Sequence, residues 1–298
     1  MKALFVGPLH SRELEVYSDA WNCWNEIPAR TTTYAAVGER CDEQILADAA
    51  AEPVDVIFYI GAAGGSGVPL IETFRTLRGI GHTIHLVCDS ADSPWHPFLR
   101  EYAENECFDL QVGLDGPLNA PVDLATLPPI NPAAYDTQPA PERNIRCGFA
   151  GQFMKRTNRG QTILQLVKHG ALTYVSREIA PTNADKNPYS HYTNFLRRCK
   201  IAFNHGWTSF DQIPTVKWRV IEGALAGCAV LENDSAPVDH WFPKGSVFHY
   251  KDADQAHGII RHRSDSEIAD VAAKLSERVR RDFSPQTIYG EMLAKVGL

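Results

Sequence analysis

The chain has 298 residues, of which 44% are hydrophobic and 22% charged, and this composition is typical of a globular protein. The formal net charge of −7 excludes a general attraction to nucleic acids or anionic membranes, but not a local basic groove. The seven cysteines form no Cys-x-x-Cys pair, and no apolar run reaches the roughly 20 residues of a membrane span. We therefore expect a protein of the reducing cytoplasm with no membrane span, and we assign no metal ligands.

Strands and helices alternate through the first 116 residues. Short apolar runs that end at Gly, Pro or Asp predict buried strands, and apolar residues at helical spacing predict helices between them. This alternation predicts a parallel sheet with helices on both faces. The predicted strands are residues 2–7, 31–36, 54–60, 84–88 and 108–113, and the predicted helices cover 41–51, 68–78 and 97–105, with one more around Tyr17.

Two loops that follow these strands hold candidates for a general base. Asp89 and Asp92 follow the fourth strand, and a carboxylate at the end of a strand is placed to accept a proton. The competing interpretation is that Asp89 or Asp92 caps the next helix. His10, after the first strand, is the alternative base. All three residues enter the set of candidate catalytic groups.

A glycine-rich loop, residues 61–67, follows the third strand and precedes a helix. Backbone N–H groups at such a position can bind phosphate. The loop lacks the Lys-Ser/Thr of a P-loop and the spacing of a dinucleotide fingerprint. A flexible turn and a ligand-facing backbone are equally compatible with it.

The composition then changes. Residues 117–142 are rich in proline and poor in periodic apolar positions, which predicts a linker between two domains. We expect an N-terminal domain over 1–116 and a C-terminal domain over 143–298, whose last helix could pack back on the first domain. Two such domains imply a cleft between them.

The strand and helix alternation resumes after the linker, which predicts a second β/α domain. One helix near the C-terminus has an apolar face formed by Ile268, Ala272, Leu275 and Val279. The predicted strands are 145–150, 171–175, 201–204, 228–231 and 247–250, and the predicted helices are 161–168, 188–198, 216–226 and 265–283.

The first strand of this domain ends at Gly151, and Gln152, Lys155, Arg156 and Arg159 follow within two turns. Glycine lets an anion approach the backbone N–H groups, and arginine offers a two-pronged donor to phosphate oxygens. A solvated basic turn is the alternative interpretation.

The stretch from Lys217 to Asp252 forms one helix–strand–turn–strand unit. Its helix ends at Gly227, and its first strand ends in a polar rim, residues 232–235, where ligands of α/β sheets gather. Glu222 lies inside the apolar helix, one turn after Arg219. The pair could form a salt bridge on the helix surface, or Glu222 could face a ligand hydroxyl.

Three segments of the second half resemble the C-terminal domain of GT-B glycosyltransferases. They are Cys147-Gly-Phe-Ala-Gly151 with Arg156, Tyr189–Asn204, and Arg219-Val-Ile-Glu222-Gly-Ala-Leu-Ala-Gly227. The third is the most specific. The sequence FPKGSVFHYKDAD, residues 242–254, resembles the tail of the same domain. The nearest resemblance is to the spore maturation protein CgeB-like branch, with its module of the type called glycosyl transferases group 1.

This resemblance implies two Rossmann-like β/α/β domains that face each other across a cleft, and transfer of a sugar from a nucleotide-sugar to an acceptor hydroxyl. It implies a metal-independent reaction with no cofactor beyond the donor substrate, a UDP- or GDP-sugar. By analogy Glu222 would hold the ribose hydroxyls. The diphosphate would lie near Gly151, Gln152, Arg156, Lys217 and Arg219, and the base near Tyr174 and Val175.

The chain departs from the family at one point. Retaining members carry a second glutamate eight positions before the position of Glu222, and this chain has Pro214 there. Inversion and retention both remain open, as do a non-catalytic nucleotide or sugar binder and a GT-B nucleotide-sugar epimerase. The sequence does not identify the acceptor, which could be a glycan, a protein, a small molecule or a nucleic acid, and it does not indicate the oligomeric state.

Overall fold

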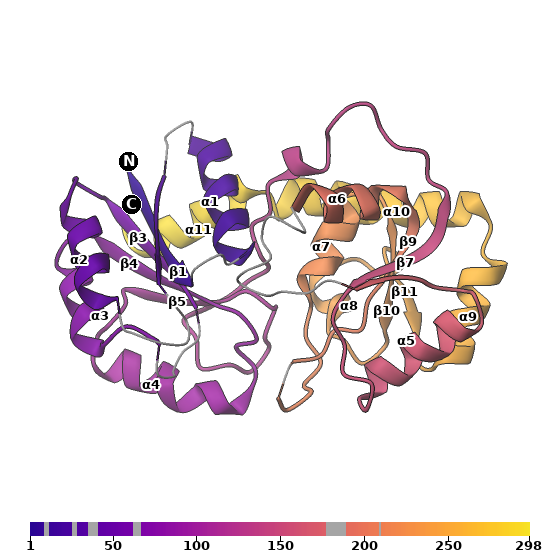
Figure 1. Cartoon of the computed structure of the whole chain (residues 1–298), viewed down its shortest axis with the longest axis horizontal. Coiled ribbons are helices and arrows are strands. Elements are labelled where there is room, and N and C mark those ends of the chain that lie inside the picture. Colours follow the sequence, from indigo (N-terminus) through magenta and orange to yellow (C-terminus); the bar gives the residue numbers. More distant parts are fainter. Residues whose placement is uncertain (9–11, 26–28, 35–40, 62–66, 177–188, 209) are drawn as a thin grey trace. The chain divides into compact units, whose positions relative to one another are not determined.

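A computed structural model of the chain describes residues 1–8, 12–25, 29–34, 41–61, 67–176, 189–208 and 210–298. The chain forms two compact units, each built around its own parallel sheet (Figure 1). Unit 1 comprises residues 1–131, 208–213 and 285–298, and unit 2 comprises residues 132–207 and 214–284. Within the described part of the chain, no helix is both long enough and apolar enough to span a membrane.

Unit 1 contains a six-stranded sheet in the order β2-β1-β3-β4-β5-β6. Each neighbouring pair is parallel, and the apolar runs of the sequence form its buried central strands. The strands are β1 (Ala3–Pro8), β2 (Arg30–Tyr34), β3 (Val56–Ile60), β4 (His82–Val87), β5 (Leu110–Gly113) and β6 (Leu124–Ala125).

Helices cover both faces of this sheet because successive side chains of a strand point to opposite sides. On one face Phe58 packs against Trp21 of α1 (Arg12–Asn25) and Tyr289 of α11 (Pro285–Lys295). On the other face the neighbouring Tyr59 packs against Phe74 of α3 (Ile71–Arg78). The remaining helices of unit 1 are α2 (Asp42–Ala50), α4 (His96–Glu104) and the short η1 (Ser93–Trp95).

The proline-rich stretch differs from a simple linker. Residues 117–131 belong to unit 1, where β6 pairs with β5 and both Leu127 and Ile130 are buried. Residues 132–142 belong to unit 2. The prolines of this stretch lie outside β6, which is an edge strand of only two residues, so none of them interrupts a strand of the sheet.

Unit 2 contains a five-stranded parallel sheet in the order β11-β10-β9-β7-β8. Its strands are β7 (Ile145–Gly151), β8 (Thr173–Ser176), β9 (Cys199–Phe203), β10 (Ala229–Asn233) and β11 (Phe248–Tyr250). Its helices are α5 (Asn158–Lys168), α6 (Tyr189–Arg198), α7 (Trp218–Leu225), α8 (Val238–Trp241), α9 (Ala253–His262) and α10 (Asp265–Asp282), with η2 (Pro132–Ala134).

The structure confirms the prediction of two parallel sheets flanked by helices. The sequence patterns did not predict α8, α9 and α11. The start of α9 carries a recognisable signal, because the side chain of Asp252 accepts a hydrogen bond from the backbone N–H of Gln255. The predicted cleft between the domains stays a prediction.

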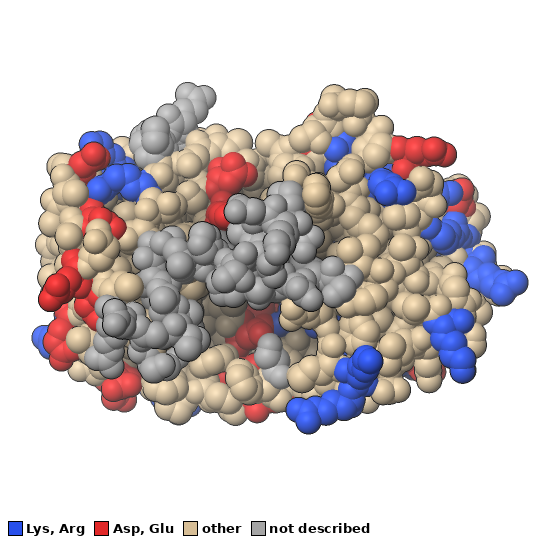
Figure 2. Space-filling model, in the orientation of Figure 1, with Lys and Arg blue, Asp and Glu red and all other residues tan. Residues whose placement is uncertain are grey.

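Charge is distributed unequally between the two units. By sequence, unit 1 has 21 acidic and 8 basic residues, a net charge of −13, and unit 2 has 15 acidic and 21 basic residues, a net charge of +6. On the face shown in Figure 2, blue side chains are accordingly frequent on unit 2 and red ones on unit 1. An anionic ligand is therefore favoured electrostatically by unit 2.

Candidate functional site

Polar groups gather at the carboxyl edge of the unit 2 sheet, where β7, β9 and β10 end. Gly151 closes β7, Asn204 follows β9, and Glu232 and Asn233 close β10. These three strands are adjacent in the sheet, so their last residues lie side by side. Ligands of parallel α/β sheets bind outside this edge.

Arg219 in the first turn of α7 connects two of these strand ends. Its Nη2 donates to the carbonyl oxygen of Ala150 at 2.7 Å, and its Nη1 donates to Oδ1 of Asn204 at 2.9 Å. Its guanidinium lies over the ring of Phe149, 4.4 Å from the centroid. The arginine is thus fixed in place at the positive end of a helix dipole, an arrangement that favours an anionic ligand.

Gly151 makes room for this arginine. Its φ of +150° is rare for residues with a side chain, and a Cβ at this position would lie 2.8 Å from Nη2 of Arg219. The absence of a side chain therefore lets the guanidinium approach the end of β7. The sequence predicts that Gly151 and Arg219 lie near one ligand, and the structure brings the two residues together.

We expect Gly151→Ala to lower the free energy of unfolding by about 1–3 kcal/mol, because alanine is strained at this φ. It should also weaken binding of the nucleotide-sugar that the sequence resemblance implies, because the new methyl group displaces Arg219. Chemical denaturation and calorimetric titration measure the two effects. Gly245→Ala is the matched control, since Gly245 also has a positive φ, but a Cβ added there would meet no atom within 4 Å. Equal binding losses in both variants would contradict the proposed contact with Arg219.

Glu232 is fully buried at this edge and accepts three hydrogen bonds. Oε2 accepts from Nδ2 of Asn204 at 2.5 Å, and Oε1 accepts from the backbone N–H groups of Gly206 at 2.8 Å and Asn233 at 2.9 Å. Burial raises the pKa of Glu232 to about 7, although these hydrogen bonds and the charge of Arg219 act in the opposite direction. A carboxyl group that titrates near neutrality therefore lies within the candidate site.

This raised pKa gives a prediction for stability. The folded state binds a proton at Glu232 that the unfolded state has released above about pH 4.5, so unfolding becomes easier as the pH rises towards 7. Relative to Glu232→Gln, the free energy of unfolding of the wild-type chain should fall by on the order of 3 kcal/mol between pH 4.5 and pH 8. Denaturant titrations of both proteins at each pH measure this difference. Parallel stability profiles would show that the carboxyl group does not titrate in this range.

His205 follows Asn204 and is also buried. The hydroxyl of Tyr250 donates to the carbonyl oxygen of Asn204 at 3.0 Å, so it accepts from Nδ1 of His205 at 2.9 Å. Nε2 is then an acceptor, and it has no hydrogen-bond partner among the described residues. Burial lowers the pKa of His205 to about 4, with a further contribution from Arg159, so the ring is neutral at physiological pH.

Glu222 lies inside unit 2 and is 2% exposed. Its Oε2 accepts a hydrogen bond from the hydroxyl of Tyr192 on α6, while Arg219 contacts Asn204 and Ala150. The carboxylate is therefore held by a neighbouring helix and does not lie on the solvated surface of α7. Lys217 is the half-buried N-cap residue of α7.

The other predicted donor-binding residues have different environments. Tyr174 on β8 is half-buried and stacks with Phe149, and Val175 beside it is 42% exposed. Gln152 and Arg156 are both exposed in the turn after β7. The backbone carbonyl of Gln152 accepts a hydrogen bond from Arg159. These residues surround the strand ends, and their roles in binding stay predictions.

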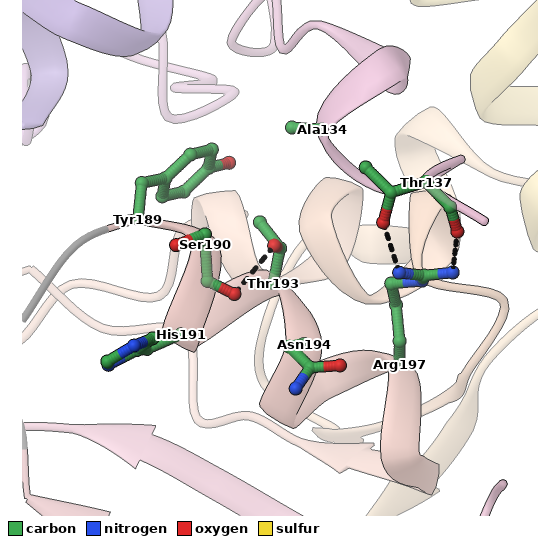
Figure 3. Close-up of a pocket in the computed structure, with 8 residues that line it drawn as sticks. All are labelled: Ala134, Thr137, Tyr189, Ser190, His191, Thr193, Asn194 and Arg197. Carbon is green, nitrogen blue, oxygen red and sulfur yellow. Dashed lines mark hydrogen bonds between the residues drawn. The ribbon is translucent and has the colours of Figure 1, made fainter. Parts of the chain in front are cut away.

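A pocket of about 440 Å³ lies elsewhere in unit 2, between α6 and the segment that begins with η2 (Figure 3). Arg197 is the cation of its lining, and both the hydroxyl and the carbonyl oxygen of Thr137 accept hydrogen bonds from it. Its charge is thus used to hold the two segments together. The full lining is Ala134, Thr137, Tyr189, Ser190, His191, Thr193, Asn194 and Arg197.

The candidate bases are in unit 1. Asp92 is fully buried, and its two carboxylate oxygens accept from the backbone N–H groups of Phe210 at 3.0 Å and Asp211 at 2.8 Å. Asp89 is half-buried and has a left-handed φ of 53°. His10 lies outside the described residues, as do residues 62–66 of the glycine-rich loop. Asp92 thus anchors the segment 208–213 in unit 1, and the catalytic roles of all three residues stay predictions.

The sequence patterns did not single out Asn204 or His205, and they indicated Glu232 only as part of a rim. The signal that could have found them was the polar sequence Asn204-His-Gly206 directly after a buried strand. The described residues include no group of three or more His, Cys, Asp or Glu side chains arranged to hold a metal ion.

The second half of the chain is similar to a known protein family. Residues 152–294, just under half of the chain, match the profile of a family described as glycosyl transferase-like. This part of the chain is similar to the glycosyl transferase-like family. The matched segment contains Arg219, Glu222 and Glu232, and it covers most of unit 2. No curated protein shows significant similarity to the chain in sequence.

Several solved GT-B structures are similar to the whole chain. HepE of Anabaena in complex with UDP-glucose has a TM-score of 0.67 at 9% identity, over 99% of both chains. An alpha-glucosyltransferase in complex with UDP and DNA has a TM-score of 0.66 at 10% identity, over 100% of this chain and 99% of the other. AviGT4, a glycosyltransferase of avilamycin A biosynthesis, has a TM-score of 0.57 at 14% identity, over 99% and 97%.

These comparisons confirm the predicted GT-B fold and the predicted resemblance to glycosyltransferases. The whole chain thus has the GT-B fold, and its second half is similar in sequence to a glycosyl transferase-like family. The placement in the CgeB-like branch stays a prediction.

Proposed function

We propose that the protein transfers a sugar from a UDP-sugar to an acceptor hydroxyl. The observation that carries this proposal is Arg219, which is fixed at the start of α7 beside Gly151 within the family segment. HepE and the alpha-glucosyltransferase, whose folds are similar, are known in complex with UDP-glucose and UDP. The net charge of unit 2 also favours an anionic donor.

In this proposal Arg219 and the N-terminus of α7 bind the diphosphate. Negative charge grows on the diphosphate when the glycosidic bond breaks, so these positive groups stabilise the transition state more than the ground state. They supply this charge without requiring a metal ion or another cofactor. Glu222 accepts hydrogen bonds from the ribose hydroxyls, and Tyr174 and Val175 lie on the side of the nucleobase.

The acceptor side is proposed to be unit 1. A general base there would take the proton from the acceptor hydroxyl as it attacks the sugar. Asp89, Asp92 and His10 are the candidates, and Asp92 is disfavoured because both of its oxygens already accept backbone hydrogen bonds. The net charge of −13 on unit 1 favours a neutral or cationic acceptor over a nucleic acid.

A thermal-shift screen of the whole chain against UDP, GDP and ADP and their glucose conjugates tests the donor assignment. A donor at 100 times its Kd stabilises the folded state by about 2.7 kcal/mol, which gives a clear rise in melting temperature. We expect the largest rise with the uridine compounds. A rise in melting temperature with guanosine compounds alone would assign a GDP-sugar as the donor. An unchanged melting temperature with every compound would argue against a nucleotide-sugar site.

Turnover separates the enzyme from a non-catalytic binder. Slow hydrolysis of UDP-glucose to UDP and glucose, in the absence of acceptor, would establish that the bound donor reacts. Conversion of the donor to an epimer with no release of UDP would instead establish an epimerase. Binding with neither reaction, under a panel of hydroxyl acceptors, would contradict the proposed transfer.

A further inference from the structure

We propose that Glu232 is a positioning residue of the donor site: its carboxylate orients the amide of Asn204, and this amide holds Arg219 in place for the diphosphate. The inference rests on the proposed function for the identity of the ligand. The hydrogen bonds that link Glu232, Asn204 and Arg219 lie within unit 2 and do not depend on the identity of the ligand. They run from β10 through the end of β9 to the start of α7.

The carboxylate of Glu232 and the guanidinium of Arg219 together select one orientation of the Asn204 amide. An ionised carboxylate can only accept hydrogen bonds, and a guanidinium can only donate them. The amide must therefore turn its NH₂ group to Glu232, at 2.5 Å, and its oxygen to Arg219, at 2.9 Å. The reverse orientation would place two acceptors together at one end and two donors together at the other.

A proton on Glu232 would reverse this preference. Oε1 already accepts from two backbone N–H groups, those of Gly206 and Asn233, so the proton belongs on Oε2. A protonated Oε2 opposes the NH₂ group of Asn204 with a second donor. If the amide turns to accept from Oε2, its NH₂ group faces Arg219, and the guanidinium loses one of its two fixed acceptors.

The groups around Glu232 allow this switch near neutral pH. Burial raises the pKa of Glu232 to about 7. Burial raises the pKa of Tyr250 on β11 well above 10, so this hydroxyl keeps one state over this range. Arg219 on α7 is linked to Glu232 through Asn204. His205 at the end of β9 is neutral, and Asp234 after β10 is exposed to solvent.

The expected consequence is that diphosphate affinity falls as the pH falls through about 7. UDP-glucose is the probe for this test, because its diphosphate is esterified at both ends and has no ionisation in this range. UDP itself is unsuitable, since a terminal phosphate has a pKa near 6. Uridine, which has no diphosphate, is the control ligand.

Calorimetric titration of the whole chain between pH 5.5 and 8.5 compares four proteins. The wild-type chain should bind UDP-glucose roughly tenfold more weakly at pH 5.5 than at pH 8.5, as the loss of one charge-assisted hydrogen bond predicts. Glu232→Gln should bind weakly at every pH, because glutamine presents its NH₂ group to Asn204 permanently. Asp270→Asn removes an exposed charge from α10 of the same unit and should behave as the wild type.

The double variant Glu232→Gln/Asn204→Asp provides the decisive result. The glutamine can donate a hydrogen bond to the new aspartate, and the aspartate can accept one from Arg219. Arg219 thus regains the acceptor that it loses in Glu232→Gln. We expect it to regain most of the affinity lost in Glu232→Gln and to have no pH dependence. Uridine affinity should be similar in all four proteins.

Three outcomes would overturn the proposal. In the first, UDP-glucose affinity of Glu232→Gln depends on pH as it does in the wild type. In the second, the double variant does not recover the affinity lost in Glu232→Gln. In the third, Glu232→Gln loses as much affinity for uridine as for UDP-glucose, which would indicate a purely structural role. A chain that binds no nucleotide would contradict the proposed function instead. In that case the side-chain NMR signals of Asn204 still test the relay, since they should titrate near pH 7 in the wild type and not in Glu232→Gln.

Discussion

Arg219→Ala should lower the affinity for UDP-glucose by about a hundredfold or more, because it removes a charge-assisted donor pair worth roughly 3 kcal/mol to a phosphate ligand. In the structure this guanidinium is fixed by Ala150, Asn204 and the ring of Phe149. No ordering of a flexible side chain is needed when the ligand binds. The proposed donor contact therefore keeps most of its interaction energy.

Arg219→Lys separates charge from geometry. Lysine keeps the positive charge but cannot contact Ala150, Asn204 and a phosphate with one planar group. We expect it to recover less than a tenth of the lost affinity. Arg263→Ala is the matched control, since Arg263 also lies over an aromatic ring of unit 2, that of Phe248, but pairs with Glu267. Wild-type affinity in Arg219→Ala would exclude this residue from the donor site.

Glu222→Ala should also lower UDP affinity by about a hundredfold, because a carboxylate that accepts from ligand hydroxyls contributes roughly 1.5–3 kcal/mol. The wild type and Glu222→Ala should bind equally a UDP analogue that lacks the 2′ and 3′ hydroxyls. Calorimetry with both ligands measures this difference. A loss of the same size with both ligands would contradict the assignment to ribose.

Glu222 also has a structural partner, so stability must be measured beside binding. Removing the carboxylate leaves the buried hydroxyl of Tyr192 without this acceptor, at a cost of about 1–3 kcal/mol. Tyr192→Phe removes the other half of the pair and keeps the carboxylate. We expect it to lower stability slightly and to retain most of the UDP affinity. If Tyr192→Phe loses as much UDP affinity as Glu222→Ala, the loss in Glu222→Ala is due to disturbed local packing and not to a lost contact with ribose.

Local patterns predicted most of the fold, because each buried strand is an apolar run of a few residues bounded by a turn signal. Val56–Ile60 is an example, since every residue in it is buried. The patterns failed where structure depends on partners far away in sequence. Leu127 and Ile130 looked like linker residues, yet they are buried in unit 1. The last helix, α11, has a weakly patterned sequence but packs Tyr289 against Trp21 and Phe58.

The candidate site shows the same contrast between local sequence features and contacts that are distant in sequence. Glycine after a strand, arginine at a helix start and a carboxylate in an apolar helix are local features, so Gly151, Arg219 and Glu222 became candidates from the sequence. Their expected roles came from the resemblance to GT-B glycosyltransferases. Their contacts are not local: Arg219 reaches Ala150, which is 69 residues away in sequence. Only the strand order of the sheet brings these residues together.

Glu232 shows most clearly what the sequence alone could determine. The polar rim after β10 was evident, because a buried apolar strand ends there in charged and amide residues. Whether that carboxylate faces solvent or the interior depends on β9 lying beside β10 in the sheet. This pairing buries Glu232 against Asn204 and Gly206, raises its pKa and links it to Arg219. The sequence determined the positions of the polar groups, and the tertiary structure decided their partners, because desolvation and hydrogen-bond direction arise only when the strands are assembled.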